Sequence, residues 1–355
     1  MQKFTVFSGF LGSGKTTTMM ALTRYFTEHY GKAAMISNDL GGPGLADHRL
    51  ARLSGCSATE LTGSCICYQT ESLVERLSQL FNREGCQLVV SDIPGFGVGA
   101  LDHVYHKLSH QYPGQFPLAP FTVLCEPDVI DALRENRDPD LSYILRSQLS
   151  EGDLIILNKI DLIDESSKNQ LISWLQSQFP WAKVLAVSAL TGQGLDEVCQ
   201  ALIHSSASLR RPELHYGGPE FVSAIGKVSE YNIQYYAVVC CDSFDGTLYL
   251  RDLAEEIRCQ IQKVNADIPH MKFLAWQPEG DYGKVDLLGI RQPVRITKPF
   301  SEACRELAVV LNASAFCPPK VLDQIAGEAM EQVSQTYNLT LTVYKKECFS
   351  AMEGS

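Results

Sequence analysis

The amino-acid sequence predicts an α/β fold: a mostly parallel sheet covered by helices over residues 1–205, followed by a smaller α+β domain. Three observations predict it. Short apolar strands alternate with helical segments, which is typical of a parallel sheet with both faces covered. A glycine-rich loop joins the first strand to the first helix. The chain of 355 residues is longer than one hydrophobic core usually serves, so two domains are expected.

The first domain begins with an apolar strand at residues 3–8, and the glycine-rich loop and a helix over residues 15–30 follow it. Residues 38–57 are polar and rich in glycine, so a long loop is expected there. Helical spacing returns at residues 70–83. The other strands of the sheet are expected at residues 33–37, 87–91, 120–125, 153–157 and 183–187.

The composition changes near Ser205. Residues 206–219 contain serine, arginine, proline and glycine with little apolar periodicity, so they are expected to form a linker. Residues 220–355 then form the second domain. Its strands are expected at 235–241, 273–276, 307–311 and 339–344, with helices at 253–264 and 321–333. This order fits a ferredoxin-like split βαβ domain.

Composition restricts the function classes. The chain has 41 acidic and 30 basic side chains and a formal net charge of -11, which argues against a general nucleic-acid-binding protein. No apolar run reaches the ~20 residues that a membrane helix needs. The N-terminus lacks a signal-peptide pattern, so a cytoplasmic protein with no membrane partner is expected. The 12 cysteines are then expected to be mostly reduced thiols.

The glycine-rich loop Gly9–Thr16 fits the phosphate-binding pattern G-x-x-x-x-G-K-[ST], with a strand before it and a helix after it. Its glycines let backbone N–H groups point at a phosphate, and the helix adds its dipole. Lys15 is expected to contact the β- and γ-phosphates, and the Thr16 hydroxyl is expected to bind Mg²⁺. A chance glycine turn is the alternative. The predicted nucleotide-binding residues of this loop are Gly12, Ser13, Gly14, Lys15, Thr16 and Thr17.

The segment Ser91–Gly95 follows the strand at residues 87–91 and completes the predicted catalytic set. Asp92 is expected to hold Mg²⁺, and the Gly95 N–H is expected to sense the γ-phosphate. A structural turn is the alternative. Phe96 follows Gly95 and cannot orient a water molecule, which predicts slow intrinsic hydrolysis and a partner or second subunit that completes the site. Lys15, Thr16, Asp92 and Gly95 are the candidate catalytic residues.

Two segments after strands predict that the base is guanine. In Asn158-Lys159-Ile160-Asp161, the carboxylate of Asp161 can accept hydrogen bonds from guanine N1–H and N2–H₂, which adenine lacks. The stem of Lys159 can cover the base. In the second segment, which begins Ser188-Ala189, the Ala189 N–H can donate to guanine O6. Both segments stand at carboxyl ends of predicted strands, where ligands of such sheets bind.

The segment Thr59–Tyr68 contains Cys65 and Cys67 and lies between the second predicted strand and the next helix. Together with Ser8–Thr17, it resembles the CobW-type GTPases, which are relatives of the nickel-enzyme maturation GTPases UreG and HypB. The resemblance implies a GTPase domain, a smaller C-terminal domain, and metal handling at a Gly-Cys-x-Cys-Cys motif beside the nucleotide. It covers residues 1 to about 205 by motif, and the second domain only in position and strand order.

The sequence departs from the family pattern in this motif. Tyr68 replaces the third cysteine, and Ser64 replaces the glycine before the first. Cys65 and Cys67 remain as candidate ligands of a transition metal such as Zn²⁺, Co²⁺ or Ni²⁺. Candidates for completing the site are Cys56, Glu60, Asp39 or a histidine. Two interpretations stay open: metal binding, or a remnant kept for packing.

Three histidines offer a second candidate metal site. His103, His106 and His110 share the polar face of the helix expected at residues 100–112. A solvated helix face is the favoured interpretation.

Two functions follow from these features. The first is a GTPase that uses hydrolysis to deliver a metal or cofactor to a client metalloenzyme. The second is a GTP-gated chaperone for a corrinoid-dependent or other metalloenzyme, which carries no metal itself. A small-molecule kinase is disfavoured because Asp161 indicates guanine. The expected switch-like loop at residues 38–57 and the missing water-orienting residue also suggest a homodimer.

Overall fold

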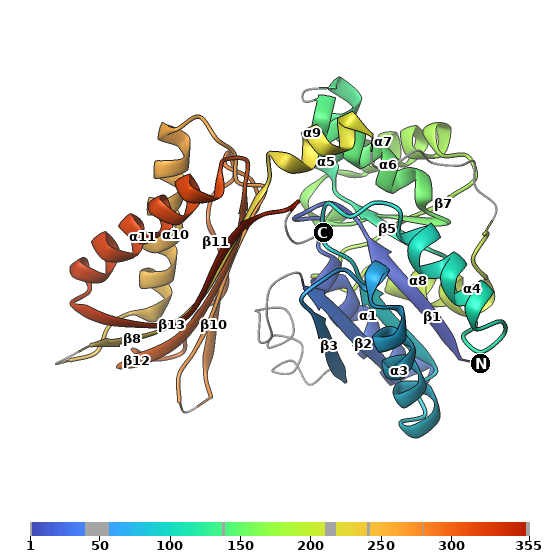
Figure 1. Ribbon diagram of the computed structural model, residues 1–355, viewed down its shortest axis with the longest axis horizontal. Helices are drawn as coiled ribbons and strands as arrows, with labels where there is room; N and C mark the ends of the chain where they lie inside the picture. Colours follow the sequence, from blue (N-terminus) through green and yellow to red (C-terminus); the bar gives the residue numbers. More distant parts are fainter. Residues whose placement is uncertain are drawn as a thin grey trace. The chain divides into compact units, whose positions relative to one another are not determined.

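The computed structural model describes residues 2–39, 57–136, 139–209, 218–239, 242–278 and 280–352 (Figure 1). The chain divides into two compact units, and the first gives way to the second between Ala224 and Ile225. This division falls within helix α9 (Pro219–Gly226). Most of the predicted linker, residues 210–217, lies outside the described residues.

The first unit contains a seven-stranded sheet in the order β3-β2-β4-β1-β5-β6-β7, in which every pairing is parallel. Its strands are β1 (Lys3–Ser8), β2 (Ala33–Asp39), β3 (Ala58–Thr62), β4 (Leu88–Asp92), β5 (Thr122–Cys125), β6 (Leu154–Leu157) and β7 (Lys183–Ala186). Strands β1, β4, β5 and β6 are buried along their whole length, because helices cover both faces of the sheet. The predicted α/β class is confirmed.

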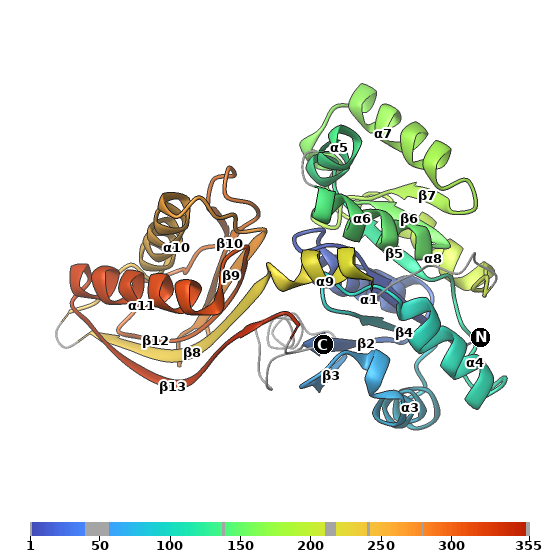
Figure 2. The same cartoon turned by 45° about the horizontal axis from the view of Figure 1, so that its top comes forward.

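Helices cover this sheet above and below in the view of Figure 2. They are α1 (Lys15–His29), α3 (Thr70–Ser78), α4 (Lys107–Gln111), α5 (Pro127–Glu135), α6 (Pro139–Glu151), α7 (Glu165–Gln178) and α8 (Leu195–His204). Shorter turns are η1 (Ile66–Tyr68), η2 (Gln79–Arg83), η3 (Leu101–His106) and η4 (Ile160–Leu162), of which η2 and η3 are π-helical. The helix predicted at residues 100–112 is therefore η3 followed by α4.

The register of the sheet aligns the carboxyl ends of its central strands. Phe7 of β1 pairs with Asp92 of β4, and Ser8 pairs with Val123 of β5. Leu157 at the end of β6 pairs with Ala186 at the end of β7. The loops that follow β1, β4, β6 and β7 therefore leave the sheet at one edge, where ligands of parallel sheets bind.

The second unit contains a six-stranded antiparallel sheet in the order β11-β10-β9-β12-β8-β13. Its elements are β8 (Ser229–Val239), α10 (Gly246–Lys263), β9 (His270–Trp276), β10 (Tyr282–Leu287), β11 (Arg295–Lys298), β12 (Glu306–Ala315), α11 (Pro319–Thr336) and β13 (Leu339–Ser350). The four strands β13-β8-β12-β9, with a helix after β8 and another after β12, form the predicted ferredoxin-like arrangement. The hairpin β10–β11 extends the sheet beyond β9.

One core holds the second unit together. Tyr235 of β8 and Phe273 of β9 are fully buried with Tyr249 of α10, and the Tyr235 and Tyr249 hydroxyls lie 3.0 Å apart. Both helices pack on this face of the sheet because their apolar residues recur at helical spacing. Among the described residues, no helix is both long and apolar enough to cross a membrane.

Candidate functional site

The glycines of the Gly9–Thr16 loop adopt backbone conformations that other residues rarely reach. Gly14 has φ of 88°, and a Cβ atom there would lie 2.4 Å from Asn158 Nδ2. A Cβ atom on Gly9, which has φ of 134°, would lie 2.2 Å from the carbonyl oxygen of Leu124. Both substitutions would force a clash, so the tertiary structure itself requires the glycine spacing seen in the sequence.

Helix α1 begins in a form suited to an anion. Gly14 caps it without a side-chain hydrogen bond, and its first turn contains no acidic residue. The first N–H groups of an α-helix have no acceptor within the helix, and they carry the positive end of its dipole. The Ser13 hydroxyl of this loop is buried without a hydrogen-bond partner. These donors fit a bound phosphate group.

The Lys15 side chain lies over the loop that precedes it. Its Nζ donates to the carbonyl oxygen of Gly9 at 2.6 Å and to that of Phe10 at 3.4 Å. Thr16, in the first turn of α1, is buried. The ammonium group is therefore already held at the mouth of the predicted phosphate site, where a phosphate would compete with these carbonyl oxygens.

Asp92 and Gly95 lie beside this loop. Asp92 pairs with Phe7 at the end of β1, is mostly buried, and accepts a hydrogen bond from the Asn38 N–H at 2.8 Å. A Cβ atom on Gly95 would lie 2.5 Å from Leu11 Cδ2 and 3.0 Å from Leu11 N, so Gly95 packs directly on the phosphate loop. Phe96 is buried. Its phenyl ring has no donor or acceptor group that could orient a water molecule.

Asn158 connects the phosphate loop to the two predicted guanine segments. Its Nδ2 donates to the carbonyl oxygen of Ser13 at 2.9 Å and lies 3.3 Å from Thr18 Oγ1. Its Oδ1 accepts from the Ala189 N–H at 3.1 Å. The N–H assigned to guanine O6 is therefore engaged with Asn158 in this structure, and a base would have to share or replace that acceptor.

The guanine segments are also tied to each other and to β5. The Ser188 hydroxyl donates to Asp161 Oδ1 at 2.6 Å, which orients the carboxylate assigned to the base. Lys159 has φ of 62°, and its ammonium group pairs with Glu126, which follows β5. The Lys159 stem is thus fixed in place. The structure brings Ser188, Ala189, Asn158 and Asp161 together at one edge of the sheet.

Cys65 and Cys67 form a closed pair. Their sulfur atoms lie 2.9 Å apart, both side chains are buried, and the Cys67 N–H donates to Cys65 Sγ at 3.4 Å. The hydrogen bond between the thiols lowers the pKa of Cys65 and raises the pKa of Cys67, because one thiolate is stabilised by the proton of the other.

Two side chains that the sequence did not identify as site residues hold the cysteine segment. Asn38 donates to the carbonyl oxygens of Leu61 and Ser64 at 3.1 and 2.9 Å, and accepts from the Ile66 N–H at 2.9 Å. Lys107 Nζ donates to the Cys67 carbonyl oxygen at 3.0 Å. Because the Asn38 N–H binds Asp92, the cysteine segment is linked to the predicted Mg²⁺ ligand. No local motif marks Lys107.

The cysteine pair as it stands does not fit a zinc site. Two thiolates on a tetrahedral zinc ion, each at ~2.3 Å, would lie about 3.8 Å apart. The observed separation is 2.9 Å. Among the residues that the structure describes, no three or more His, Cys, Asp or Glu side chains gather as a metal site. Glu60 therefore completes none, and Cys56 and the Asp39 side chain lie outside the described part of the chain.

The three histidines do not form a metal site either. The π-helical turn of η3 changes the angular spacing that an α-helix would give them. His106 lies 3.5 Å from Asp102 and stacks with His110 at 6.3 Å between ring centroids. His103 instead faces Tyr68 at 6.1 Å, and Tyr68 is 64% exposed.

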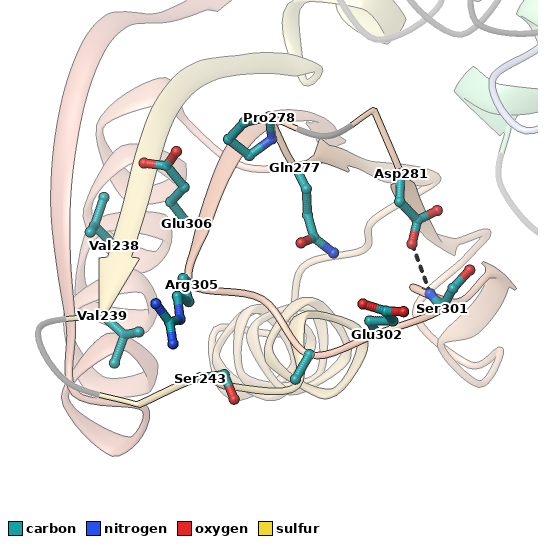
Figure 3. Close-up of a pocket in the computed structure, with 11 residues that line it drawn as sticks. Val238, Val239, Ser243, Gln277, Pro278, Asp281, Ser301, Glu302, Arg305 and Glu306 are labelled. Atoms are coloured by element: carbon teal, nitrogen blue, oxygen red, sulfur yellow. Dashed lines mark hydrogen bonds between the residues drawn. The ribbon is translucent and has the colours of Figure 1, made fainter.

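The second unit has an open cavity of about 910 Å³, shown in Figure 3, which contains none of the predicted site residues. Its lining includes Arg305 and the carboxylates of Asp281, Glu302 and Glu306. Asp281 accepts from the Ser301 N–H at 2.8 Å, and its hydrogen bond with Lys298 lowers its pKa to about 2. These contacts tie the loop after β11 to the β9–β10 turn.

A protein-family model described as "CobW/HypB/UreG, nucleotide-binding domain" matches residues 3–186. GTPase Era of Ehrlichia ruminantium (strain Gardel) is 26% identical over 131 residues, which are 37% of this chain and 43% of that protein. The zinc chaperone CobW of Sinorhizobium sp is 27% identical over 188 residues, 46% of this chain and 52% of that protein. The chain thus spans about half the length of these relatives or less.

Two solved structures are similar at low sequence identity. HypB from Helicobacter pylori, in complex with nickel, is 20% identical with a TM-score of 0.41, and the match covers 57% of this chain and 86% of that one. The Zn(II)-bound YjiA GTPase from E. coli is 14% identical with a TM-score of 0.35, and the match covers 94% of this chain and 98% of that one.

Proposed function

Because the chain belongs to the CobW/HypB/UreG family of nucleotide-binding proteins, we propose that it binds GTP with Mg²⁺ and hydrolyses it. The observation that carries this proposal is the position of Asn158. Its side-chain amide donates a hydrogen bond to the Ser13 carbonyl oxygen of the phosphate loop and accepts one from the Ala189 N–H of the guanine segment. A nucleotide that lies along the ends of β1, β6 and β7 would contact all three elements.

Each residue of the phosphate site has a role in this proposal. The backbone N–H groups of Gly12 to Thr17 surround the β-phosphate, and Lys15 exchanges its carbonyl acceptors for the β- and γ-phosphates. Thr16 and Asp92 would hold Mg²⁺, which when bound neutralises charge on the β- and γ-phosphate oxygens. The Gly95 N–H donates to the γ-phosphate, and its contact with Leu11 places it at the loop.

Guanine selection rests on Asp161. Its carboxylate, oriented by Ser188, accepts from two base N–H groups, and the Lys159 stem covers the base while its ammonium group stays on Glu126. Adenine would leave this acceptor without donors, which costs binding free energy.

Hydrolysis by the protein alone is proposed to be slow. Phe96 follows the γ-phosphate sensor and is buried, so no side chain at that position orients the attacking water. A client or a second copy of the chain would complete the site. A single-turnover rate above ~1 s⁻¹ for dilute protein would contradict this part, given the slow intrinsic rates of comparable switches.

The purpose proposed for hydrolysis is delivery of a metal ion to a client metalloenzyme. The names of two similar proteins mention zinc or nickel. Cys65 and Cys67 supply two thiols, and Asn38 links their segment to Asp92 by hydrogen bonds to Asp92 and to the Ser64 carbonyl oxygen. The cargo would be Zn²⁺, Co²⁺ or Ni²⁺, ions that thiolate and imidazole ligands bind. The thiols must separate to bind the metal ion. Because such an ion takes about four ligands, the others would come from elsewhere on the chain, the nucleotide or the client.

A second candidate function is a GTP-gated chaperone that carries no metal, with a client that is corrinoid-dependent or another metalloenzyme. The closed thiol pair and the replacement of the third motif cysteine by Tyr68 favour it.

Elemental analysis of the purified protein with and without GTP distinguishes the two functions. Stoichiometric metal that is lost in the double variant Cys65→Ser/Cys67→Ser supports delivery. Absence of metal in every nucleotide state, together with capture of an enzyme in GTP and not in GDP, supports the chaperone. Absence of GTP binding contradicts both.

A further inference from the structure

Helix α6 holds the segment that follows Asp92. Near the end of this helix, Gln148 is buried, and its Nε2 donates to the carbonyl oxygens of Gly95 and Gly97 at 3.1 and 3.0 Å. The residue proposed to sense the γ-phosphate is therefore fixed through its carbonyl group to a helix of the scaffold. No local sequence pattern marks this role, because Gln148 lies 53 residues from Gly95.

Glu151, one helical turn further along α6, holds the other end of the same segment. Its Oε1 accepts from the Gly99 N–H at 2.6 Å and its Oε2 accepts from the Leu101 N–H at 2.9 Å. Leu101 begins η3, so a buried carboxylate from another element occupies the positive end of this helix. Such hydrogen bonds are short and strong because the acceptor can carry charge.

The helix held by Glu151 reaches the cysteine pair. Six residues after Leu101, Lys107 donates to the Cys67 carbonyl oxygen at 3.0 Å. On the other side of the pair, the Asn38 side chain donates a hydrogen bond to the Ser64 carbonyl oxygen, and the Asn38 backbone N–H donates one to Asp92. Contacts therefore run from Gly95 through α6, η3 and the first residue of α4 to Cys67, and from Asp92 through Asn38 to Ser64.

We infer that Gln148 and Glu151 are positioning residues that couple the γ-phosphate to the cysteine pair. When the Gly95 N–H turns to a γ-phosphate, the carbonyl group of Gly95, in the next peptide unit, pulls on Gln148. The segment up to Leu101 moves as a unit with η3, and Lys107 shifts the Cys67 backbone so that the thiols separate. This inference rests on the proposed function, since it requires that GTP occupies the phosphate loop.

One atom of the Gln148 side chain lacks a partner in the observed arrangement. Its Oε1 is buried and has no hydrogen-bond partner. A buried acceptor without a donor is unfavourable. A rotation of the Gly95–Gly97 backbone that turned an N–H group toward this oxygen would satisfy it. In this inference, the conformation with a bound γ-phosphate is the one in which Gln148 is better bonded.

The test uses the full chain and two readouts that need no metal. The first is kcat and KM for GTP. The second is the rate at which an alkylating reagent labels the peptide that contains Cys65 and Cys67, followed by mass spectrometry, with GDP and with a non-hydrolysable GTP analogue. In the wild-type protein we expect labelling at least about fivefold faster with the analogue, which corresponds to a coupling in the usual range.

Gln148→Met keeps the shape of the side chain and removes both hydrogen bonds. We expect equal labelling with the two nucleotides, a kcat about tenfold lower and a KM within about twofold, because the lost contacts act on the sensor and not on nucleotide affinity. Glu151→Gln keeps one acceptor and should give an intermediate loss of coupling. Arg146→Gln, at an exposed position of the same helix, is the control and should behave as the wild type.

Three results would overturn the inference. One is a Gln148→Met protein with wild-type kcat and wild-type nucleotide dependence of labelling. Another is equal labelling in the wild type while GTP is hydrolysed, which leaves the proposed GTPase function intact. The third is a wild-type protein that binds no GTP, which removes the proposed function as well. Thermal melting of each variant separates these results from misfolding, and Gln148→Met remains informative if Glu151→Gln is unstable.

Discussion

The phosphate loop and the cysteine segment lie on loops of the same unit, yet they differ in how complete they are. In the phosphate loop, glycines with positive φ, a helix start without a side-chain cap and the Lys15 ammonium group lie within one short segment. In the cysteine segment, the two thiols bond to each other and to backbone groups, 2.9 Å apart and buried. One site is open to its ligand and the other is closed.

This difference has a physical origin. A phosphate is bound largely by backbone N–H groups, which the fold fixes once the loop has formed. A metal ion needs several side chains at set distances, and thiols without metal satisfy one another instead. The open site can therefore receive its ligand first, and the closed one requires a rearrangement. The following predictions test that order, from the largest expected effect to the smallest.

Removal of the loop's ammonium group should have the largest effect. Lys15→Ala is expected to lower GTP affinity about a thousandfold, since charge-assisted hydrogen bonds to two phosphates are lost. Titration with a fluorescent GTP analogue measures it. Lys32→Ala, an exposed lysine paired with Glu84, is the control. A loss smaller than about tenfold would show that the phosphates bind elsewhere.

The carboxylate of Glu151, which connects the segment after Asp92 to η3, should make the free energy of unfolding depend on pH. Burial raises the pKa of Glu151 to about 7 from an ordinary value of 4.5, and the charge of Asp102 adds to this. Because the folded protein favours the protonated form of Glu151, this group stabilises the folded state fully below pH 4.5. The stabilisation is lost as the pH rises through about 7. The loss should be about 3 kcal/mol in the free energy of unfolding.

Urea unfolding from about pH 4.5 to about pH 8 measures this loss as the difference between wild type and Glu151→Gln. The difference separates Glu151 from the titratable groups that interact with it, which are Asp102 on η3 and the thiols of Cys65 and Cys67. Parallel profiles for the two proteins would show that Glu151 titrates as an ordinary surface carboxylate.

Base recognition should depend on the Asp161 carboxylate, in which Asp161→Asn changes a single atom. Asp161→Asn replaces an acceptor with a donor opposite guanine N1–H, so GTP affinity should fall about a hundredfold and xanthosine triphosphate should become the better ligand. Competition binding measures both. Asp164→Asn, which removes the carboxylate that caps α7, is a nearby control. An unchanged preference for GTP would overturn the assignment of the base.

Loss of the thiols should affect the nucleotide least. Because the nucleotide is proposed to bind before the metal, Cys65→Ser/Cys67→Ser should leave GTP affinity within about twofold. Metal binding in the presence of GTP should be lost. Isothermal titration with GTP and then with Co²⁺ measures both, and Cys259→Ser, at an exposed cysteine, serves as the control. A drop in GTP affinity above about tenfold would show that the cysteine pair is part of the nucleotide site.

Sequence patterns predicted most of the fold because they report local structure. The apolar runs of β1, β4 and β6 and the turn chemistry around them are visible without any knowledge of the tertiary structure. Strand β3 was missed because Ala58–Thr62 lies at the sheet edge, is only partly buried, and has no apolar run. The π-helical turn of η3 was also missed, since no composition marks it.

The sequence by itself determined which ligand the first unit is suited to bind. The spacing from Gly9 to Lys15 and the segment Asn158–Asp161 each act within a few residues, so their chemistry is written in the order of the chain. The tertiary structure decided how the parts are joined. Asn158 meets Ser13 across 145 residues, and Glu151 meets Leu101 across 50. Such contacts depend on how strands and helices pack, which local patterns do not encode.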